Sequence, residues 1–214
     1  MKKQEKKINQ ILKIIIEHVT LNLKQYIIIS TIFLIGIILG VILVNNAQDE
    51  TKMQIGKNIT TFIYKLKFEC EIDYSSLLKN VIINHIIFIF IIWFMGCTVI
   101  GIPIVYAMIA FKGFSLGYTI SLIIYILGFQ KGIAFCTITL LLQNILIIPA
   151  ILSIAVSGMN LYKAIMKDKR KENIKIEIIK HTIFSLAILL VLLIASCLEV
   201  YGSNMLLSLC IRYF

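Results

Sequence analysis

The stretch that decides the fold is Val81–Met166, which reads VIINHIIFIFIIWFMGCTVIGIPIVYAMIAFKGFSLGYTISLIIYILGFQKGIAFCTITLLLQNILIIPAILSIAVSGMNLYKAIM. Its charged side chains are Lys112, Lys131 and Lys163, and it holds no acidic residue. A helix needs about 20 apolar residues to cross a bilayer. The stretch is long enough for several crossings and predicts an integral membrane protein.

The composition of the whole chain supports this prediction. Hydrophobic residues make up 59% of the 214 residues, and charged residues make up 15%, whereas about a quarter of a soluble domain is charged. The formal net charge of +10 does not indicate nucleic-acid binding. The lysines gather at the ends of apolar segments, and no basic patch is interleaved with aromatic side chains. We therefore expect membrane lipid, and no nucleic acid, as a partner.

The basic residues also predict the orientation. Lysines are frequent in the first 25 residues and again between residues 162 and 180, and such clusters stay on the cytoplasmic side. One crossing leads out, an odd number must return, and three fit the length of the apolar stretch. The expected crossings are residues 26–44, 81–101, 102–127, 132–161 and 181–201. The N-terminus is then cytoplasmic and the C-terminus extracytoplasmic, in a multi-pass protein of the cell membrane.

The chain divides into two parts on this plan. Residues 1–25 would form a cytoplasmic amphipathic helix, either on the inner membrane surface or as an extension of the first crossing. Residues 26–206 would form one five-helix membrane domain. This domain would include an extracytoplasmic segment over residues 45–80 and a cytoplasmic basic loop over residues 162–180.

Local signals predict how some of these helices pack and begin. Gly36 and Gly40 form a GxxxG step, which lets another helix approach closely in lipid. In the extracytoplasmic segment, apolar residues between positions 55 and 66 recur with helical spacing and predict a short amphipathic helix. Asp73 or Ser75 is a candidate N-cap for the helix that follows.

The second and third crossings have no charged loop between them. Their boundary is set by Gly96, Gly101 and Pro103, residues that weaken a helix or remove a backbone donor. The pair Lys112–Gly113 then falls inside the third crossing, where an ammonium is costly. We expect either a break at this pair or a re-entrant segment, buried against other helices. The predicted fold class is therefore all-α: a polytopic helical membrane protein with about five transmembrane helices, one broken or re-entrant, plus an N-terminal amphipathic helix.

Polar side chains inside the crossings are candidate interaction sites. Lys112 either pairs with a partner or lines a polar cavity, or it extends from a helix end to the head groups. Glu199 is the natural counter-charge for Lys112, or it contacts an outer partner from the membrane interface. Gln143 and Asn144, close to Pro149, would hydrogen-bond to backbone freed at the predicted break, to a partner helix, or to another helix of the chain.

Catalytic and metal-binding chemistry is not indicated. The three histidines are predicted at membrane boundaries, and none of the HExxH, P-loop, GxSxG or paired-carboxylate motifs occurs. No cysteine belongs to a CxxC pair or lies near a histidine at metal-ligand spacing, although a Cys70–Cys210 disulfide would be possible if both residues lie outside. We expect no enzyme activity and no cofactor.

Several short motifs follow one another along the chain. They are Trp93–Gly96, Gly101–Pro103, Phe111–Tyr118, Gln143–Asn144, Ile148–Ala150 and Glu199. Their order and spacing resemble the stage II sporulation protein M family, from the N-terminal helix to Tyr201, and the five-crossing plan agrees with that family.

This resemblance implies a role in endospore formation. The family member lies in the mother-cell membrane and works with two peptidoglycan-degrading partners, stage II sporulation proteins D and P, during engulfment of the forespore. It carries out no chemistry itself, but locates and assembles the enzymes that remodel the septal wall. The alternative is a transporter or channel-like membrane subunit, because broken helices with polar residues at the midplane suit substrate sites.

Overall fold

The computed structural model describes residues 16–67, 73–98, 100–167 and 171–202. Within these ranges the chain is helical and has no strand, and five helices are long and apolar enough to cross a membrane. They are α2 (Leu23–Asn46), α4 (Tyr74–Gly96), α5 (Gly101–Leu127), α7 (Leu142–Lys167) and α8 (Lys171–Cys197). The predicted fold class, a polytopic helical membrane protein, is confirmed.

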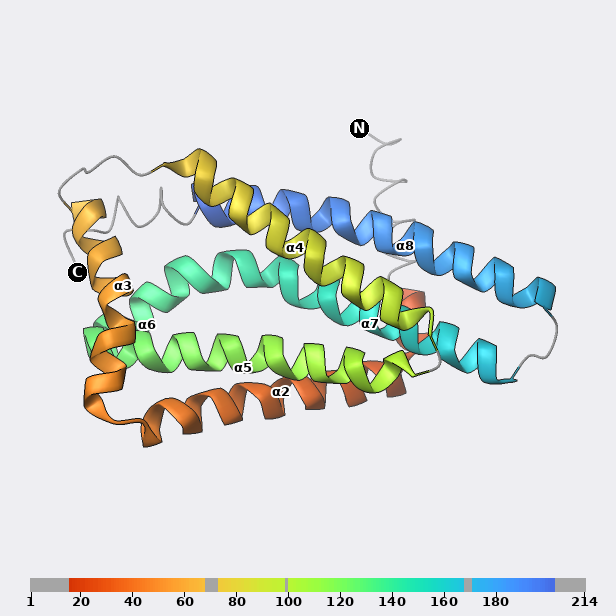
Figure 1. The fold of residues 1–214 in the computed structure, drawn as a ribbon, viewed down its shortest axis with the longest axis horizontal. Coiled ribbons are helices and arrows are strands. Elements are labelled where there is room, and N and C mark those ends of the chain that lie inside the picture. Colours follow the sequence, from red (N-terminus) through yellow and green to blue (C-terminus); the bar gives the residue numbers. More distant parts are fainter. Residues whose placement is uncertain (1–15, 68–72, 99, 168–170, 203–214) are drawn as a thin grey trace.

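The five long helices lie side by side along the long axis of the molecule, whereas α3 (Asp49–Lys67) lies across one end (Figure 1). Helix α3 is the short helix predicted within residues 45–80. Helix α4 begins where expected, because the Asp73 side chain accepts a hydrogen bond from the backbone N–H of Ser76 at 3.1 Å and so caps the helix. Which side of the membrane α3 faces stays a prediction.

The amphipathic helix expected near the N-terminus lies mostly outside the described residues. Residues 16–21 are helical, and a turn at Asn22 separates them from α2. Cys70 and Cys210, the possible disulfide pair, also lie outside the described residues.

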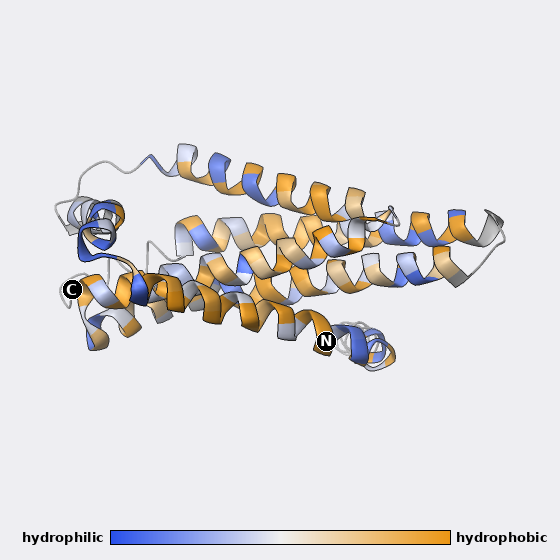
Figure 2. Cartoon of the chain, turned by 60° about the horizontal axis from the view of Figure 1, so that its bottom comes forward, coloured by the Kyte–Doolittle hydropathy of each residue, from blue (hydrophilic) through white to orange (hydrophobic). Residues whose placement is uncertain are grey.

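Helix α7 is the central helix of the bundle. Half of its membrane span is buried, against 17–28% in the other four spans. The most deeply buried aliphatic side chains are Ile29, Ile92, Val105, Ile109, Ile147, Ile151, Ile154, Val156, Leu161 and Leu192. Hydrophobic residues also cover the outward faces of the long helices, while hydrophilic residues gather toward the helix ends (Figure 2). This distribution suits a bundle surrounded by lipid tails, which are as apolar as leucine.

The expected irregularity, either a break at Lys112–Gly113 or a re-entrant segment, is wrong, because α5 is one continuous helix from Gly101 to Leu127. Gly113 serves helix packing: a Cβ atom built on it would collide with the backbone carbonyl of Phe33 in α2. Gly117, one turn further on, lies equally close to the backbone of Ile37. The sequence pattern therefore marks a close approach of two helices, not an interruption of one.

The GxxxG residues of α2 lie in the same helix contact. A Cβ atom on Gly36 would meet the Ala110 carbonyl and lie 3.0 Å from the Phe114 nitrogen, and one on Gly40 would lie 2.7 Å from the Tyr118 nitrogen. Two GxxxG steps thus face each other, and the backbones of α2 and α5 touch. The predicted packing face at Gly36 and Gly40 is confirmed, and its partner is α5.

Within the described chain, π-helical geometry occurs at two places, before α7 and after α8. The short helix α6 (Phe129–Cys136) runs through the π-helical segment η1 (Thr137–Leu141) directly into α7, and a second π-helical segment, η2 (Leu198–Gly202), follows α8. Gly128, with φ of 78°, allows the turn between α5 and α6. Figure 1 shows the α6–η1–α7 run as an arch over α5.

Candidate functional site

A polar pocket lies between α4, α5 and the segment η2, inside the membrane domain. Its volume is about 230 Å3. The lining residues are Val81, Asn84, His85, Phe88, Phe111, Lys112, Ser115 and Glu199. The α4 residues recur at three- and four-residue steps, which places them on one face of that helix. The pocket is therefore a feature of three chain segments that are far apart in the sequence.

His85 and Glu199 approach each other closely in this pocket. Nε2 of His85 lies 3.5 Å from Oε2 of Glu199, within ion-pair distance but without hydrogen-bond geometry. The His85 side chain is 7% exposed and that of Glu199 27%. The π-helical geometry of η2 carries Glu199, and such segments are frequent at functional sites.

Lys112 completes the pocket from the α5 side. It lies 11 residues after Gly101 and 15 residues before Leu127, or about 16 and 22 Å from the two helix ends at 1.5 Å per residue. A four-carbon side chain does not reach the head groups over such distances, so the interpretation of Lys112 as a residue at a helix end does not fit α5. Glu199 acts on its ammonium electrostatically, but the two side chains form no ion pair within the part of the chain that the structure describes.

The predicted boundary residues Gly96, Gly101 and Pro103 form the turn between α4 and α5. Gly96 ends α4, and Pro103 lies in the first turn of α5, where a missing N–H is tolerated. A Cβ atom on Gly96 would lie 2.9 Å from Nε2 of His181. The turn thus packs tightly against α8 and stands outside the polar pocket.

His85 lies inside the membrane domain, not at its boundary as predicted, whereas His181 packs against Gly96 at the end of α4. His85 is in the middle of α4 and 6% exposed, and His181 is in α8 and 2% exposed. The Nδ1 atom of His181 lies 2.9 Å from Oγ of Ser157 in α7, so one of its two ring nitrogens has a hydrogen-bond partner. Hydropathy alone placed His85 incorrectly, because a polar residue is accommodated inside the membrane when a neighbouring segment provides its partner.

Asn144 makes a hydrogen bond within its own helical run. Its Nδ2 donates to the backbone carbonyl of Leu140 at 2.7 Å, within the π-helical segment η1. The first expected alternative, a bond to backbone freed by a break between Gly101 and Lys112, does not form, because α5 is continuous there. Gln143 lies beside Asn144 at the start of α7, and Pro149 lies exposed within that helix. None of these three residues lines the polar pocket.

Hydrogen bonds between side chains of α2, α7 and the turn before α2 were not predicted from the sequence. Tyr26 donates its hydroxyl proton to Oγ of Ser153 at 3.0 Å, and Nδ2 of Asn160 donates to Oδ1 of Asn22 at 2.7 Å. Ser153 and Asn160 are seven residues apart, two helical turns, so they share a face of α7. The spacing of these polar residues along the otherwise apolar α7 was the sequence signal that could have predicted a polar contact on this face.

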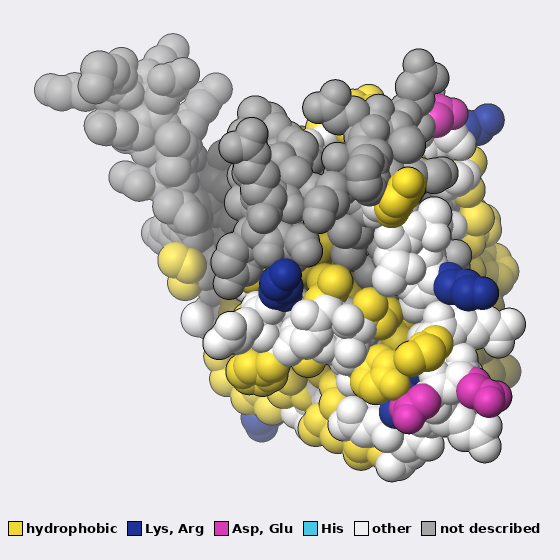
Figure 3. All heavy atoms as spheres, turned by 90° about the vertical axis from the view of Figure 1, so that its left-hand side faces the viewer, with side chains coloured by type: hydrophobic (Ala, Val, Ile, Leu, Met, Phe, Trp, Pro, Cys, Tyr) yellow, Lys and Arg dark blue, Asp and Glu magenta, His cyan; other side chains and the backbone are white. Residues whose placement is uncertain are grey.

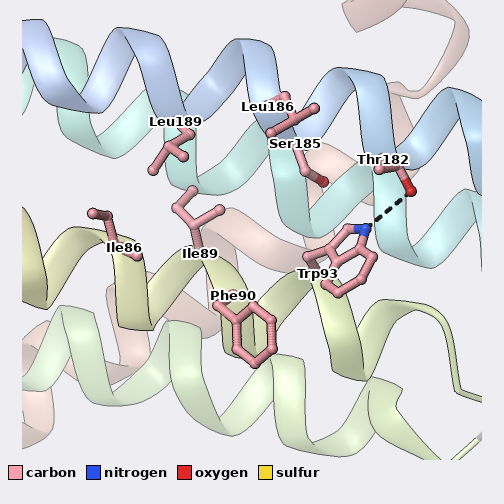
Figure 4. A pocket seen from close by; sticks show the side chains of 8 residues that line it. All are labelled: Ile86, Ile89, Phe90, Trp93, Thr182, Ser185, Leu186 and Leu189. Carbon is pink, nitrogen blue, oxygen red and sulfur yellow. Dashed lines mark hydrogen bonds between the residues drawn. The ribbon is translucent and has the colours of Figure 1, made fainter.

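An apolar groove of about 270 Å3 lies between α4 and α8 (Figure 4). Its lining residues are Ile86, Ile89, Phe90, Trp93, Thr182, Ser185, Leu186 and Leu189. The polar groups in it are satisfied: Nε1 of Trp93 donates to Oγ1 of Thr182 at 3.1 Å, and Ser185 donates to the His181 carbonyl at 2.7 Å. Lipid tails can therefore fill this groove, whereas they would leave the polar groups of the other pocket without partners.

Helix α3 is fixed to the end of α5 by a charged cluster. The Tyr125 hydroxyl donates to Oδ1 of Asp49 at 2.9 Å, Nζ of Lys52 lies 3.3 Å from the same oxygen, and Lys52 lies 4.7 Å from the centre of the Tyr125 ring. The hydrogen bond from Tyr125, and then Lys52, lower the pKa of Asp49 below its ordinary value. Gly56 packs against the Ile126 side chain, so one face of α3 is held against the bundle.

The described residues contain no group of three or more His, Cys, Asp or Glu side chains that could hold a metal ion. Five membrane helices, a polar pocket between three of them and a helix across one end define a class: a polytopic helical membrane protein with an intramembrane polar site.

Comparison with known proteins gives the family. The family model of Stage II sporulation protein M matches residues 29–204, and the chain belongs to this family. It is a membrane protein of a sporulation family, and this is not a known enzyme family. No match is found among curated proteins or among solved structures.

Proposed function

We propose that this protein is a non-enzymatic scaffold that assembles and localises peptidoglycan hydrolases in the membrane during forespore engulfment. The proposed partners are stage II sporulation proteins D and P. The family membership supports a role in sporulation, and the structure offers a surface suited to holding other proteins at one end of the bundle.

The exposed apolar side chains of helix α3, which is fixed to one end of the bundle, are the observation on which this proposal depends. Its contacts with Tyr125 and Ile126 fix one face to α5, and exposed apolar side chains lie beside that face. Met53 is 66% exposed and Ile55 40%. Figure 3, which looks onto this end of the molecule, shows hydrophobic, acidic and basic side chains side by side. Exposed apolar groups that form a continuous patch rimmed by polar residues mark protein interaction sites, and we take Met53 and Ile55 as part of such a patch.

The described residues give no support to catalysis. Ser157 and His181 are the serine–histidine contact that could suggest a nucleophile and its base, but His181 is 2% exposed. A glycan or peptide substrate has no access to a side chain at that depth. The scaffold interpretation therefore fits better than a hydrolase.

The test is co-purification of the hydrolases with variants of α3. Met53→Glu should reduce recovery of the D and P proteins, because it places a charge on the exposed apolar flank of α3. Thr61→Glu, on the exposed outward side of the same helix, is the matched control and should retain them. Purified protein alone should release no glycan fragments from peptidoglycan. Unaided cleavage, or normal recovery of both hydrolases with Met53→Glu, would contradict the proposal.

A second candidate function, a transporter or channel-like subunit, is favoured by the polar pocket alone. A pocket with charged groups at mid-membrane suits a substrate or ion site. The continuous α5 removes the broken helix that first suggested transport. Solute flux in proteoliposomes that disappears in Lys112→Ala would establish this function instead of the scaffold.

A further inference from the structure

We propose that the polar pocket between α4 and α5 is a docking site for the transmembrane helix of a partner protein, one that carries an acidic side chain near its midpoint. This inference rests on the proposed scaffold function, because it states how a membrane-anchored partner would be recognised. Four properties of the pocket lead to it: an incompletely paired cation, empty space beside that cation, a lateral opening, and the depth of that opening.

The cation is Lys112. Its ammonium forms no hydrogen bond or ion pair within the described ranges, although Glu199 lines the same pocket. Glu199 instead has its carboxylate 3.5 Å from His85. About 230 Å3 of space remains between these side chains. A charge in the membrane is costly unless an opposite charge or hydrogen-bonding groups accompany it, so an additional acceptor in this space would stabilise the site.

The pocket opens toward the surrounding lipid. Asn84 of α4 and Ser115 of α5 are exposed, and Phe111 is 66% exposed. Asn84 lies 10 residues after Tyr74 and 12 before Gly96, so the opening is near mid-membrane. The side chains of Asn84 and Ser115 form no hydrogen bond with any other part of the described chain. Hydrocarbon tails satisfy neither an amide nor a hydroxyl, which distinguishes this opening from the apolar groove beside α8.

The opening lies near mid-membrane and faces lipid, and these two properties limit which kind of molecule reaches the pocket. A water-soluble ligand would have to cross hydrocarbon to reach it, and a lipid head group remains at the membrane interface, about 15 Å from the bilayer centre. A transmembrane helix already presents side chains at mid-membrane. The available donors are the Lys112 ammonium, the Asn84 amide and the Ser115 hydroxyl, and a carboxylate on the incoming helix would accept from them.

A second copy of the same chain fits less well. The sequence from Tyr74 to Lys167 contains no acidic residue, and Glu172 and Glu177 lie at the start of α8. Glu199 is thus the acid that a second copy could offer at this depth, and it already lies in its own pocket beside His85. An acidic residue from another protein supplies what this chain lacks.

The test uses synthetic transmembrane peptides as probes. Each is a Leu/Ala helix without tryptophan that carries a dansyl acceptor, and the three peptides differ only in a central Glu, Gln or Leu. The chain has a single tryptophan, Trp93 of α4, so energy transfer from Trp93 in phosphatidylcholine nanodiscs reports binding. The Glu peptide should bind with saturation, the Gln peptide more weakly, and the Leu peptide at background.

Variants of the full-length protein make the test specific. Lys112→Met should weaken binding of the Glu peptide roughly tenfold, the upper range expected for one polar contact between helices in lipid. Lys112→Arg should preserve binding, and Lys79→Met, which removes an exposed lysine near the start of α4, should not alter it. Circular dichroism of each variant establishes that the helices remain folded.

Three results would overturn the inference. The first is equal binding of the Glu and Leu peptides, and the second is unchanged binding of the Glu peptide by Lys112→Met. The third is an efficient disulfide between two copies of Asn84→Cys in a background without the native cysteines, which would make this surface a homodimer interface. The assay contains no hydrolase, so failure here leaves hydrolase assembly through α3 standing.

Discussion

His85 and Glu199 lie with Nε2 and Oε2 3.5 Å apart, which connects the middle of α4 to the segment after α8. Together with Lys112 they place a cation, an anion and an imidazole in one pocket of the membrane domain. Charged groups at this depth are stable only when they accompany one another.

Glu199→Gln should destabilise the bundle. The substitution removes the negative charge near Lys112 and His85, and we expect the free energy of unfolding in detergent to fall by about 1–3 kcal/mol. Thermal unfolding measures the change. Glu177→Gln is the matched control, because the Lys180–Glu177 pair is substantially exposed and its loss should cost under about 1 kcal/mol. Equal effects of the two substitutions would contradict a role for the Glu199 charge.

The double variant Lys112→Met with Glu199→Gln should lose less free energy of unfolding than the two single variants lose in total. The two opposite charges share one pocket and interact electrostatically, so removing one leaves the other with less compensation, and removing both relieves that cost. A double-mutant cycle in the same detergent measures the coupling. Additive changes would show that the two residues do not interact, in spite of lying in one pocket.

Gly117→Val should weaken the contact between α2 and α5. Even its Cβ atom would lie 2.9 Å from the Ile37 Cα, and overpacking of this kind costs about 1–3 kcal/mol. Unfolding in detergent measures the loss. Ala107→Val, at an exposed position of the same helix, has the same final side chain and should have little effect. A stable Gly117→Val would contradict the observed backbone contact.

The attachment of α3 should depend on pH. The pKa of Asp49 is lowered by the Tyr125 hydrogen bond and then by Lys52, so the folded state favours the carboxylate. This stabilisation is present above the unfolded pKa of 3.8 and is lost as the pH falls through the lower folded value. Tyr125→Phe should raise the pKa of Asp49 toward 3.8, as measured by NMR of labelled aspartate. An unchanged Asp49 titration would show that the hydrogen bond does not form.

The orientation of the protein is tested by labelling single cysteines. In a background without native cysteines, a membrane-impermeant thiol reagent should label Thr51→Cys, at the start of α3, from outside intact cells. It should label Met166→Cys, at the end of α7, only after the membrane is permeabilised, because the basic residues near it favour the cytoplasm. The reverse labelling pattern would invert the predicted topology and place α3 away from the cell wall.

The sequence was sufficient to predict the number of crossings, but it assigned the wrong role to Gly113. Five apolar segments are visible in the hydropathy pattern because each must span the hydrocarbon on its own. In a sequence, a glycine beside a lysine is compatible with two structures, a broken helix or a close approach of two helices. Only the position of Phe33 of α2 against Gly113 decides between them.

For the histidines, too, the sequence was not sufficient to identify the side chains that they contact. Nothing near His85 or His181 in the sequence identifies a partner, because Glu199 and Ser157 lie far along the chain. The pairs Tyr26–Ser153 and Asn22–Asn160 were missed for the same reason. Polar residues at helical spacing in α7 were visible in the sequence, but which helix they face was not.

The sequence by itself determined that the chain lies in a membrane, how many times it crosses, and which family it resembles, because transfer of each segment into lipid depends on that segment's own side chains. The tertiary structure decided that Asn84, His85, Lys112, Ser115 and Glu199 share one pocket and that two glycine pairs hold α2 against α5. These are relations between helices, and they depend on how the helices rotate and pack against one another, which hydropathy does not encode.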